Sequence, residues 1–184
     1  FTLDSIVAQG AGMWHTAIIA TEITGAANKI GFRLRGEDAS VKDLFLDCPA
    51  QTQRSSGGYA FLKSNAPGAT LANWSIENVW ITHTVTGPWM SDSFNGTIRG
   101  CRIRGTYADG IHVNSSNVLV EHNHIRGAGD DGIALYSPEK KPVNVNQTAR
   151  FNTVVANWHA QNCSISGGAG ILVEDNWLAD GARV

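Results

Sequence analysis

The sequence has few charged residues. Asp, Glu, Lys and Arg together make up 16% of its 184 residues, and the formal net charge is -2. The usual share in globular domains is about 25%, and no stretch gathers Lys and Arg into a basic patch. Binding to nucleic acid depends on such positive charge, so nucleic acid is not expected as a partner.

Long hydrophobic runs and long helical patterns are also missing. The longest apolar runs, such as TAIIA and VLV, are far shorter than the roughly 20 residues that a helix needs to cross a bilayer, so no membrane is expected as a partner. Residues 17–30 come nearest to a helical pattern, but their β-branched residues and internal glycine argue against a helix. Three cysteines at wide spacing (Cys48, Cys101 and Cys163) predict neither a disulfide framework nor a metal site.

The sequence is instead rich in glycine, with 20 residues, and carries an internal repeat. The repeated pattern is aliphatic, two variable, small or Asn, one variable, aliphatic. Copies begin at Ile76, Ile98 and Val120, so the same step separates each copy from the next. Weaker copies begin at Val41 and Val154, and longer steps separate them from Ile76 and Val120. These longer steps predict a rung plus a loop.

The pattern inside a copy breaks the strict alternation of a strand by two residues, which indicates a corner. Short strands and corners in units of about 22 residues are typical of a parallel β-helix, whose rungs stack roughly 4.8 Å apart. The sequence therefore predicts an all-β fold of this kind, with an interior aliphatic stack and an interior ladder that ends in asparagines. The predicted members are Ile76, Ile98, Val120, Val154 and Val173 in the stack, and Val79, Cys101, Asn123, Asn157 and Asn176 in the ladder.

The same step brings acidic residues together. Asp109 follows Ile98 at the same interval at which Asp131 follows Val120, so ADGIHV and DDGIAL occupy the same place on consecutive rungs. Asp130 precedes Asp131 at a corner, so all three carboxylates are expected to border one cleft. Because like charges repel, the pKa of at least one of them is raised. A protonated carboxyl beside ionised ones is what acid–base catalysis requires.

Further binding candidates surround the acids. Tyr107 and His112 flank Asp109 in the sequence, and Arg126 is predicted to stack on Arg104 just before the acids. The repeat also predicts an outward column of mainly aromatic residues beside these candidates. Exposed aromatic faces in such a column could stack on sugars. The column is predicted to contain Trp80, Arg102, His124, Trp158 and Trp177. Trp89, one step before the interior Ile111, is predicted to be part of the core. The predicted substrate-binding residues are Tyr107, His112, His124, Arg126 and Trp158.

The segments YADGIHV (107–113) and GAGDDGIALYS (127–137), set in this repeat, resemble the signature of the inverting β-helix glycosidases. The chain is most similar to the α-1,3-glucanases of the mutanase or mycodextranase type, and AQGAGMWHTAI (8–18) resembles a rung of those enzymes and of related dextranases. The resemblance implies a right-handed, pectin-lyase-like parallel β-helix. It also implies that residues 1–184 form a single β-helix domain within a longer catalytic domain. By the same resemblance, Asp130 is the general acid, and Asp109 and Asp131 activate water.

Polygalacturonases of the same clan share the Asp-Gly and Asp-Asp motifs but add Gly-His-Gly and Arg-Ile-Lys. The corresponding region here, NCSISGGAG (162–170), has neither, which favours a neutral glucan. The resemblance thus implies hydrolysis of α-1,3-glucan with inversion, by a secreted monomer that needs no cofactor. The open alternatives are a dextranase, a polygalacturonase-like glycosidase, a polysaccharide lyase that uses Ca²⁺, and a non-catalytic carbohydrate-binding β-helix.

Overall fold

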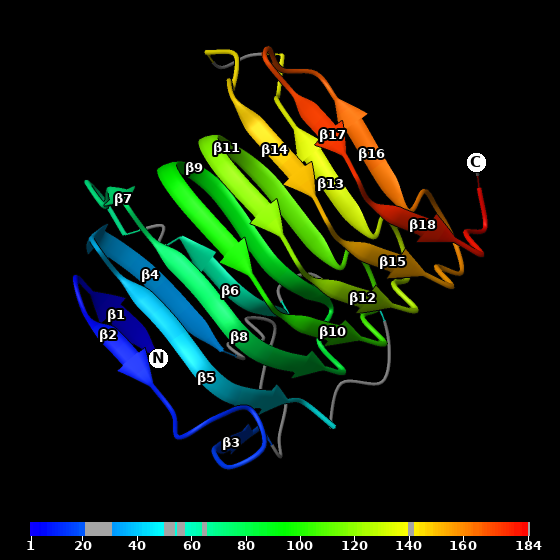
Figure 1. The fold of residues 1–184 in the computed structure, drawn as a ribbon. Coiled ribbons are helices and arrows are strands. Elements are labelled where there is room, and N and C mark those ends of the chain that lie inside the picture. Colours follow the sequence, from blue (N-terminus) through cyan, green and yellow to red (C-terminus); the bar gives the residue numbers. More distant parts are fainter. Residues whose placement is uncertain (21–30, 50–53, 55–57, 64–65, 140–141, 184) are drawn as a thin grey trace.

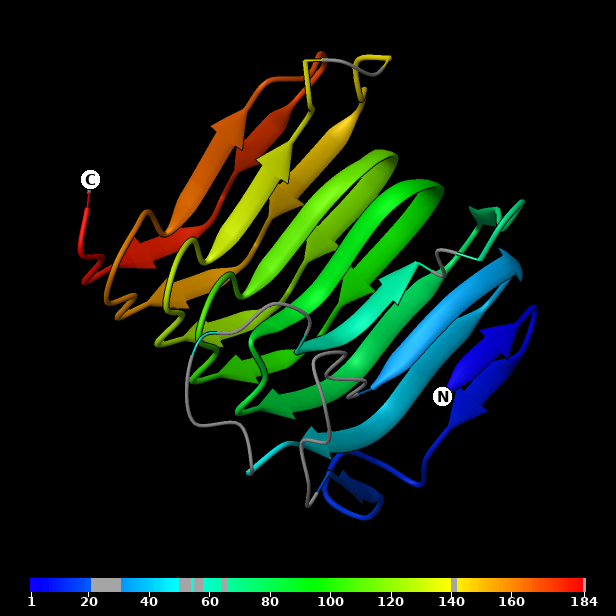
Figure 2. The same ribbon diagram turned by 180° about the vertical axis from the view of Figure 1, so that it is seen from behind.

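The structure, a computed structural model, describes residues 1–20, 31–49, 54, 58–63, 66–139 and 142–183. Its strands coil into a β-helix whose rungs stack on one another (Figures 1 and 2). All pairings between named strands are parallel in this part of the chain. The predicted all-β parallel β-helix is therefore confirmed.

No helix occurs in the described ranges, and so none that is long and apolar enough to span a membrane. Of the segment 17–30, whose pattern argues against a helix, only residues 17–20 are described. They contain the strand β3 (Ala17–Ile19), and residues 21–30 lie outside the described part.

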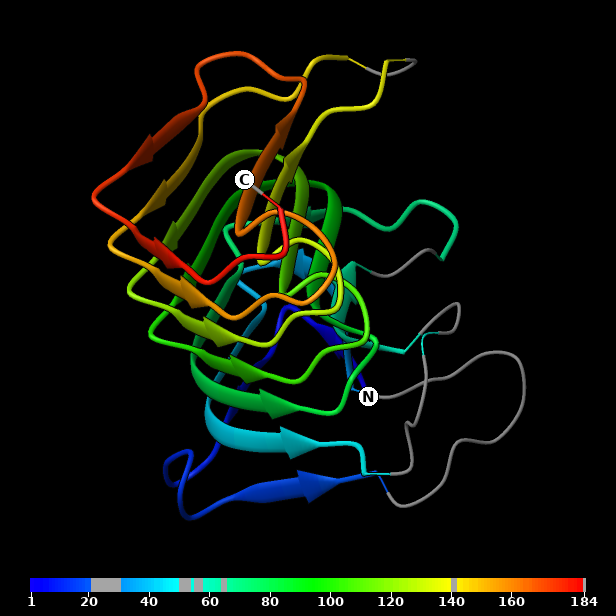
Figure 3. The same ribbon diagram turned by 90° about the vertical axis from the view of Figure 1, so that its right-hand side faces the viewer.

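The strands join into one coiled sheet with three faces that run along the helix axis, which we call sheets 1, 2 and 3, and Figure 3 shows them around a common interior. Sheet 1 contains β1 (Thr2–Asp4), β4 (Phe32–Glu37), β6 (Tyr59–Lys63), β13 (Ile133–Tyr136), β16 (Cys163–Ser166) and the first parts of β9 (Thr86–Arg99) and β11 (Ile111–Glu121). Sheet 2 contains β2 (Val7–Gln9), β14 (Gln147–Arg150), β17 (Leu172–Glu174), the first parts of β5 (Ser40–Asp47) and β8 (Ser75–Thr82) and the last parts of β9 and β11. Sheet 3 contains β3, β10 (Arg102–Arg104), β12 (His124–Arg126), β15 (Thr153–Val155), β18 (Trp177–Ala179) and the last parts of β5 and β8. The short β7 (Leu71–Ala72) pairs with β4 and β9.

The corner between sheets 2 and 3 explains the break in the sequence repeat. On each rung from β5 onwards, one residue there has a φ between 51° and 64°, which turns the chain without ending the stack. Asn and Gly reach this conformation most easily, and the other residue types adopt it at some cost. The corner residues are Asp43, Asn78, Gly100, His122, Phe151 and Asp175.

The register of the repeat is confirmed from Val41 to Val120, including the longer step between Val41 and Ile76, and is wrong after Val120. Ile98 lies between Ile76 and Val120 as predicted. Val120 then pairs with Ala149 rather than Val154, and Val154 belongs to sheet 3. Both starting points offer an aliphatic or small apolar residue followed three positions later by Asn, so the pattern alone does not separate them.

The interior asparagine ladder shifts accordingly. Asn123 Nδ2 donates to Asn152 Oδ1 at 3.0 Å, and Asn152 Nδ2 donates to Asn176 Oδ1 at 2.9 Å. Asn152 thus takes the place predicted for Asn157. The ladder satisfies buried backbone groups as well, since Asn123 Oδ1 accepts from the backbone N–H of Cys101 at 2.9 Å.

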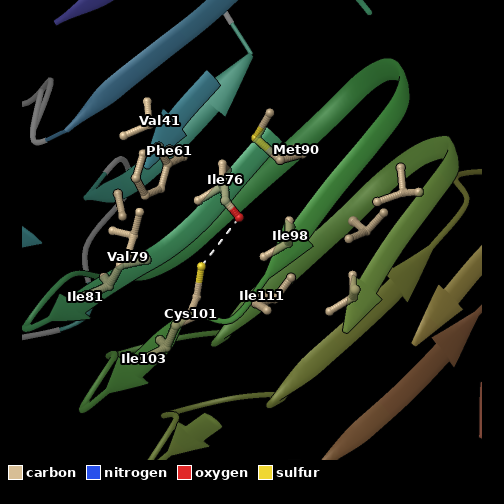
Figure 4. Packing of buried hydrophobic residues seen from close by; sticks show 14 of the residues in the cluster. Val41, Phe61, Ile76, Val79, Ile81, Met90, Ile98, Cys101, Ile103 and Ile111 are labelled. Carbon is tan, nitrogen blue, oxygen red and sulfur yellow. Dashed lines mark hydrogen bonds between the residues drawn. The ribbon is translucent and has the colours of Figure 1, made fainter. Parts of the chain in front are cut away.

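Aliphatic side chains from all three sheets fill the interior (Figure 4). Ile76, Ile98, Val120 and Ala149 have no exposed surface. Burying an Ile or Val fully stabilises the fold by about 1.5–3 kcal/mol relative to exposure. Cys101 points into the same interior, where its Sγ lies 3.5 Å from the carbonyl oxygen of Ile76. Burial raises the pKa of this thiol to about 12, so it is structural.

Candidate active site

The turn from sheet 3 to sheet 1 carries the three aspartates. The turn of one rung lies directly against the turn of the next, because the backbone N–H of Gly110 donates to the carbonyl oxygen of Asp131 at 2.8 Å. The strands that follow continue this register, with Ile111 beside Ile133. Asp109 and Asp131 therefore occupy the same place on consecutive rungs, as the constant step predicts.

The neighbouring rungs carry uncharged residues at this place. On the preceding rung, Gly87 donates its N–H to the carbonyl oxygen of Asp109 at 3.3 Å, as Gly110 does to that of Asp131. Gly87 therefore aligns with Gly110, and the uncharged Thr86 aligns with Asp109. On the following rung, Gln161 donates its backbone N–H to Asp131 Oδ1 at 3.1 Å. Acidic residues on every rung would indicate an ordinary solvated surface. Acidic residues on two rungs, with uncharged residues on the rungs before and after, indicate a local site.

Two of the carboxylates have partners that carry or can carry positive charge. Asp109 Oδ2 lies 2.9 Å from His112 Nδ1, and both side chains are buried. Asp130 Oδ2 lies 2.7 Å from a terminal nitrogen of Arg54, and both of these side chains reach solvent. Of these two carboxylates, Asp130 is therefore the accessible one and Asp109 the enclosed one.

Asp131 accepts hydrogen bonds from two uncharged donors, namely Ser164 Oγ at 2.5 Å and the Gln161 N–H. Burial raises the pKa of the Asp131 carboxyl, and the charges of Asp109 and Asp130 raise it further. The two hydrogen bonds act in the opposite direction. The sequence predicts a raised pKa for at least one of the three carboxyls, and in the structure the pKa of Asp131 is raised.

Trp158 lies beside the acids, although not in the column predicted for it. Thr153 takes the column position next to His124. Trp158 is 60% exposed, and its ring lies against Gly129, where a Cβ would come within 2.5 Å of Cζ2. Because Gly129 precedes Asp130, the exposed ring borders the turn that carries the candidate general acid.

Tyr107 lies on the other side of the same glycine. A Cβ on Gly129 would come within 2.6 Å of the Tyr107 carbonyl oxygen, so the two residues enclose Gly129 from neighbouring rungs. The Tyr107 side chain is half-buried. The structure thus brings the Tyr107 backbone and the Trp158 ring together at the acidic turn.

His124 and Arg126 lie elsewhere, on sheet 3. Arg126 pairs with Arg104 as predicted, and both are exposed. Burial lowers the pKa of His124, and the charge of Arg104 lowers it further. Among the described residues, no hydrogen bond or ion pair joins His124 or Arg126 to the triad. Their predicted role in substrate binding therefore gains no support from contacts.

Three residues near the acids were missed by sequence reasoning. Arg54 lies outside the repeated pattern. Ser164 can be placed near the acids only when the register of β16 against β13 is known. Trp89 was predicted to be core, and this is wrong. It pairs with His112 rather than Ile111 because the register of β9 and β11 is shifted by one residue there. A shift of one residue reverses the face of a strand, so Trp89 is only partly buried and stacks on His112.

No group of three or more His, Cys, Asp or Glu side chains in the described part of the chain is arranged to hold a metal ion. The side-chain partners of the three acids are Arg54, His112 and Ser164.

The fold and the acidic turn define a class, the parallel β-helix proteins with clustered aspartates on consecutive rungs. Residues 3–183 match the family described as α-1,3-glucanase catalytic domain D2. The chain belongs to this family. No curated protein matches it.

Solved structures share the fold. The catalytic domain of a GH87 α-1,3-glucanase in complex with nigerose superposes with a TM-score of 0.78 at 24% identity, over 95% of this chain and 31% of that chain. The Agl-KA catalytic domain gives 0.75 at 25% identity, over 94% and 32%. The A-module of the Azotobacter vinelandii mannuronan C-5 epimerase AlgE4 gives 0.65 at 17% identity, over 95% and 56%. The chain spans about a third of the length of the glucanase domains that it matches.

Proposed function

We propose that the protein containing this chain hydrolyses α-1,3-glucan with inversion at the anomeric carbon. The observation that carries the proposal is the acidic turn, with Asp109, Asp130 and Asp131 on two stacked rungs of a chain that belongs to an α-1,3-glucanase catalytic family. Such activity acts on a polysaccharide outside the cell, so the proposal includes secretion. It also includes action as a monomer, because one chain supplies all three acids.

In the proposed reaction, Asp130 donates a proton to the glycosidic oxygen as the bond to the anomeric carbon breaks. Asp109 and Asp131 hold a water molecule on the opposite face of the sugar and accept its proton as the water oxygen attacks. The products are a shortened glucan and a new reducing end of inverted configuration. Asp130 is left ionised and Asp109 or Asp131 protonated, and proton exchange with solvent restores the starting state. No metal ion or organic cofactor is needed for these steps.

The exposure of Asp130 supports its role as the acid, because the glycosidic oxygen has to reach it. Its Oδ2 forms an ion pair with Arg54. The proposal therefore requires that glucan binding separates Arg54 from Asp130, so that the carboxyl carries a proton in the complex. Trp158 and Tyr107 border the same turn, where a Trp face offers a platform for a sugar ring.

The raised pKa of Asp131 favours a second assignment of roles, in which Asp131 is the acid and Asp130 helps to activate water. A substrate whose leaving group needs no proton separates the two. On α-1,3-glucan, loss of the acid is expected to lower kcat about 100- to 10,000-fold. On an α-nigerosyl fluoride, the same variant retains most of its rate, because fluoride departs without a proton. The two variants to compare are Asp130→Asn and Asp131→Asn.

The glucanase proposal has support from a relative. Solved structures of the GH87 α-1,3-glucanase include three single Asp→Ala variants in complex with nigerose or tetrasaccharides, two of them at adjacent aspartates. Here too, two adjacent aspartates lie in the acidic turn.

A substrate panel tests the proposed function itself. The full-length protein is incubated with α-1,3-glucan, dextran and polygalacturonate, and reducing sugar is measured. Release from α-1,3-glucan alone supports the proposal, and release from dextran or polygalacturonate alone moves the protein to another glycosidase of the clan. A lyase would instead produce an unsaturated sugar that absorbs in the ultraviolet. Binding of glucan without any release would indicate a non-catalytic carbohydrate-binding β-helix.

A further inference from the structure

His112 is held more tightly than a residue that only borders a sugar-binding cleft needs to be. It lies on the outward face of β11, directly after the acidic turn, and is buried together with Asp109. Its Nδ1 lies 2.9 Å from Asp109 Oδ2. An ionised carboxylate can only accept a hydrogen bond, so Nδ1–H is the donor when Asp109 is ionised.

The imidazole ring is fixed from both neighbouring rungs. The ring of Trp89 on β9 stacks on it, with centroids 3.8 Å apart and planes inclined by 3°. On the other side, the ring of Tyr136 on β13 lies 5.6 Å away at 45°. Trp89 is itself packed against Tyr59 at 5.2 Å. Rotation of the imidazole about its bonds would break these contacts, so the direction of Nδ1–H is set.

Asp109 is correspondingly held at both oxygens. Oδ2 faces His112, and Oδ1 accepts the backbone N–H of Asp131 at 3.3 Å. The contact with Asp131 comes from the next rung and is long, so the shorter bond to His112 dominates the orientation of the carboxylate.

We propose that His112 is a positioning residue for Asp109. Its Nδ1–H orients the carboxylate that helps to activate water, and Trp89 orients His112 in turn by stacking. The inference rests on the proposed function, because it assigns the pair to one side of the hydrolytic reaction. It gives His112 a different role from direct contact with the sugar, and it gives Trp89 a role at the site.

Two substitutions separate the hydrogen bond from the ring. His112→Phe keeps a flat ring for Trp89 but has no nitrogen, whereas His112→Asn retains an N–H donor close to the Nδ1 position. In the full-length protein, we expect His112→Phe to lower kcat on α-1,3-glucan about 10- to 100-fold, the range for a lost hydrogen bond to a charged group. KM stays within about twofold of the wild-type value, because substrate contacts are kept, and His112→Asn recovers most of the lost kcat.

The chain offers a matched control in a second His–Asp pair outside the triad. His83 Nδ1 lies 2.7 Å from Asp47 Oδ1, and His83 is 53% exposed. His83→Phe removes a pair of the same kind and is expected to leave kcat unchanged. Thermal unfolding of each variant shows whether it is folded before its kinetics are compared.

A second measurement does not depend on activity. In protein labelled with ¹⁵N-histidine, the ring resonances that disappear in His112→Phe belong to His112. Asp109→Asn is expected to shift them strongly, and Asp130→Asn to leave them nearly in place.

The outcomes are distinct. A rise in KM with unchanged kcat, an equal loss of kcat in folded Phe and Asn variants, or resonances that ignore Asp109→Asn would each overturn the inference. A wild-type protein that does not release sugar from α-1,3-glucan contradicts the proposed function instead. In that case the ¹⁵N resonances of His112 alone test its hydrogen bond to Asp109.

Discussion

The interior asparagine ladder allows a stability prediction that can be worked out bond by bond. Asn123 is 2% exposed and makes its hydrogen bonds inside the β-helix. Its Oδ1 accepts from the backbone N–H of Cys101 at 2.9 Å, and its Nδ2 donates to the carbonyl oxygen of Ile98 and to Asn152 Oδ1, both at 3.0 Å. Replacing Asn123 by Ala removes all three bonds at once.

The magnitude follows from the fate of each partner. The Cys101 N–H is buried and loses its acceptor, and a buried orphan donor costs about 1–3 kcal/mol. The bonds to Ile98 and Asn152 contribute about 0.5–1.5 kcal/mol each. Together, Asn123→Ala is expected to lower the free energy of unfolding by about 2–6 kcal/mol.

Equilibrium urea unfolding of the whole catalytic domain measures this loss, with Asn117→Gly as the control. Asn117 belongs to an exposed asparagine ladder, bonded to Asn95 at 3.1 Å and to Asn146 at 3.0 Å. Glycine tolerates its φ of 56°, and water replaces its lost bonds, so the control is expected to lose less than about 1 kcal/mol. If Asn123→Ala loses no more than the control, the interior ladder does not stabilise the fold as argued.

Four other predictions concern the site and the core. Because the folded-state pKa of Asp131 is raised, ionisation of this carboxyl destabilises the fold above that pKa, and the destabilisation is absent below the ordinary pKa of 3.8. Asp131→Asn should therefore raise the melting temperature at pH 7 and not at pH 3. An equal gain in melting temperature at both pH values would refute the raised pKa. Trp158→Ala should raise KM for glucan at least about tenfold with little change in kcat, as loss of a stacking platform does, and steady-state kinetics would contradict this if kcat alone fell. Gly129→Ala should also raise KM for glucan, because a Cβ at this position collides with the Trp158 ring and the Tyr107 carbonyl. An unchanged KM would show that the turn can accommodate the Cβ. Cys101 should resist thiol reagents until the protein unfolds, since it is 1% exposed and its pKa is raised to about 12, and labelling of the native protein would contradict its burial.

Much of the fold was predictable, because a repeat of constant length fixes which residues become neighbours. Ile98 and Val120 could be stacked from their spacing alone, and Asp109 was placed beside Asp131 in the same way. The prediction also held across the longer step from Val41 to Ile76, and it failed after Val120. After Val120 an insertion lengthens the rung, and two candidate registers, at Ala149 and Val154, both fit the pattern.

The candidate site was predictable in its acids and less so in their surroundings. A one-residue shift between β9 and β11 moved Trp89 from the predicted core to the face that carries His112, and such a shift leaves no periodic signal. Arg54 reaches Asp130 from a segment outside the repeat. Spacing could not reveal Arg54, because a contact made across several rungs depends on the path of the chain.

The anomeric configuration of the first product tests the central claim most directly. The full-length protein is mixed with soluble α-1,3-glucan oligosaccharides, and proton NMR spectra are recorded before mutarotation equilibrates the new reducing ends. The account predicts that the β-anomer appears first and that Asp109→Asn, Asp130→Asn and Asp131→Asn each reduce its rate of appearance. Initial release of the α-anomer, or undiminished release by the three variants, would contradict inverting hydrolysis at this acidic turn.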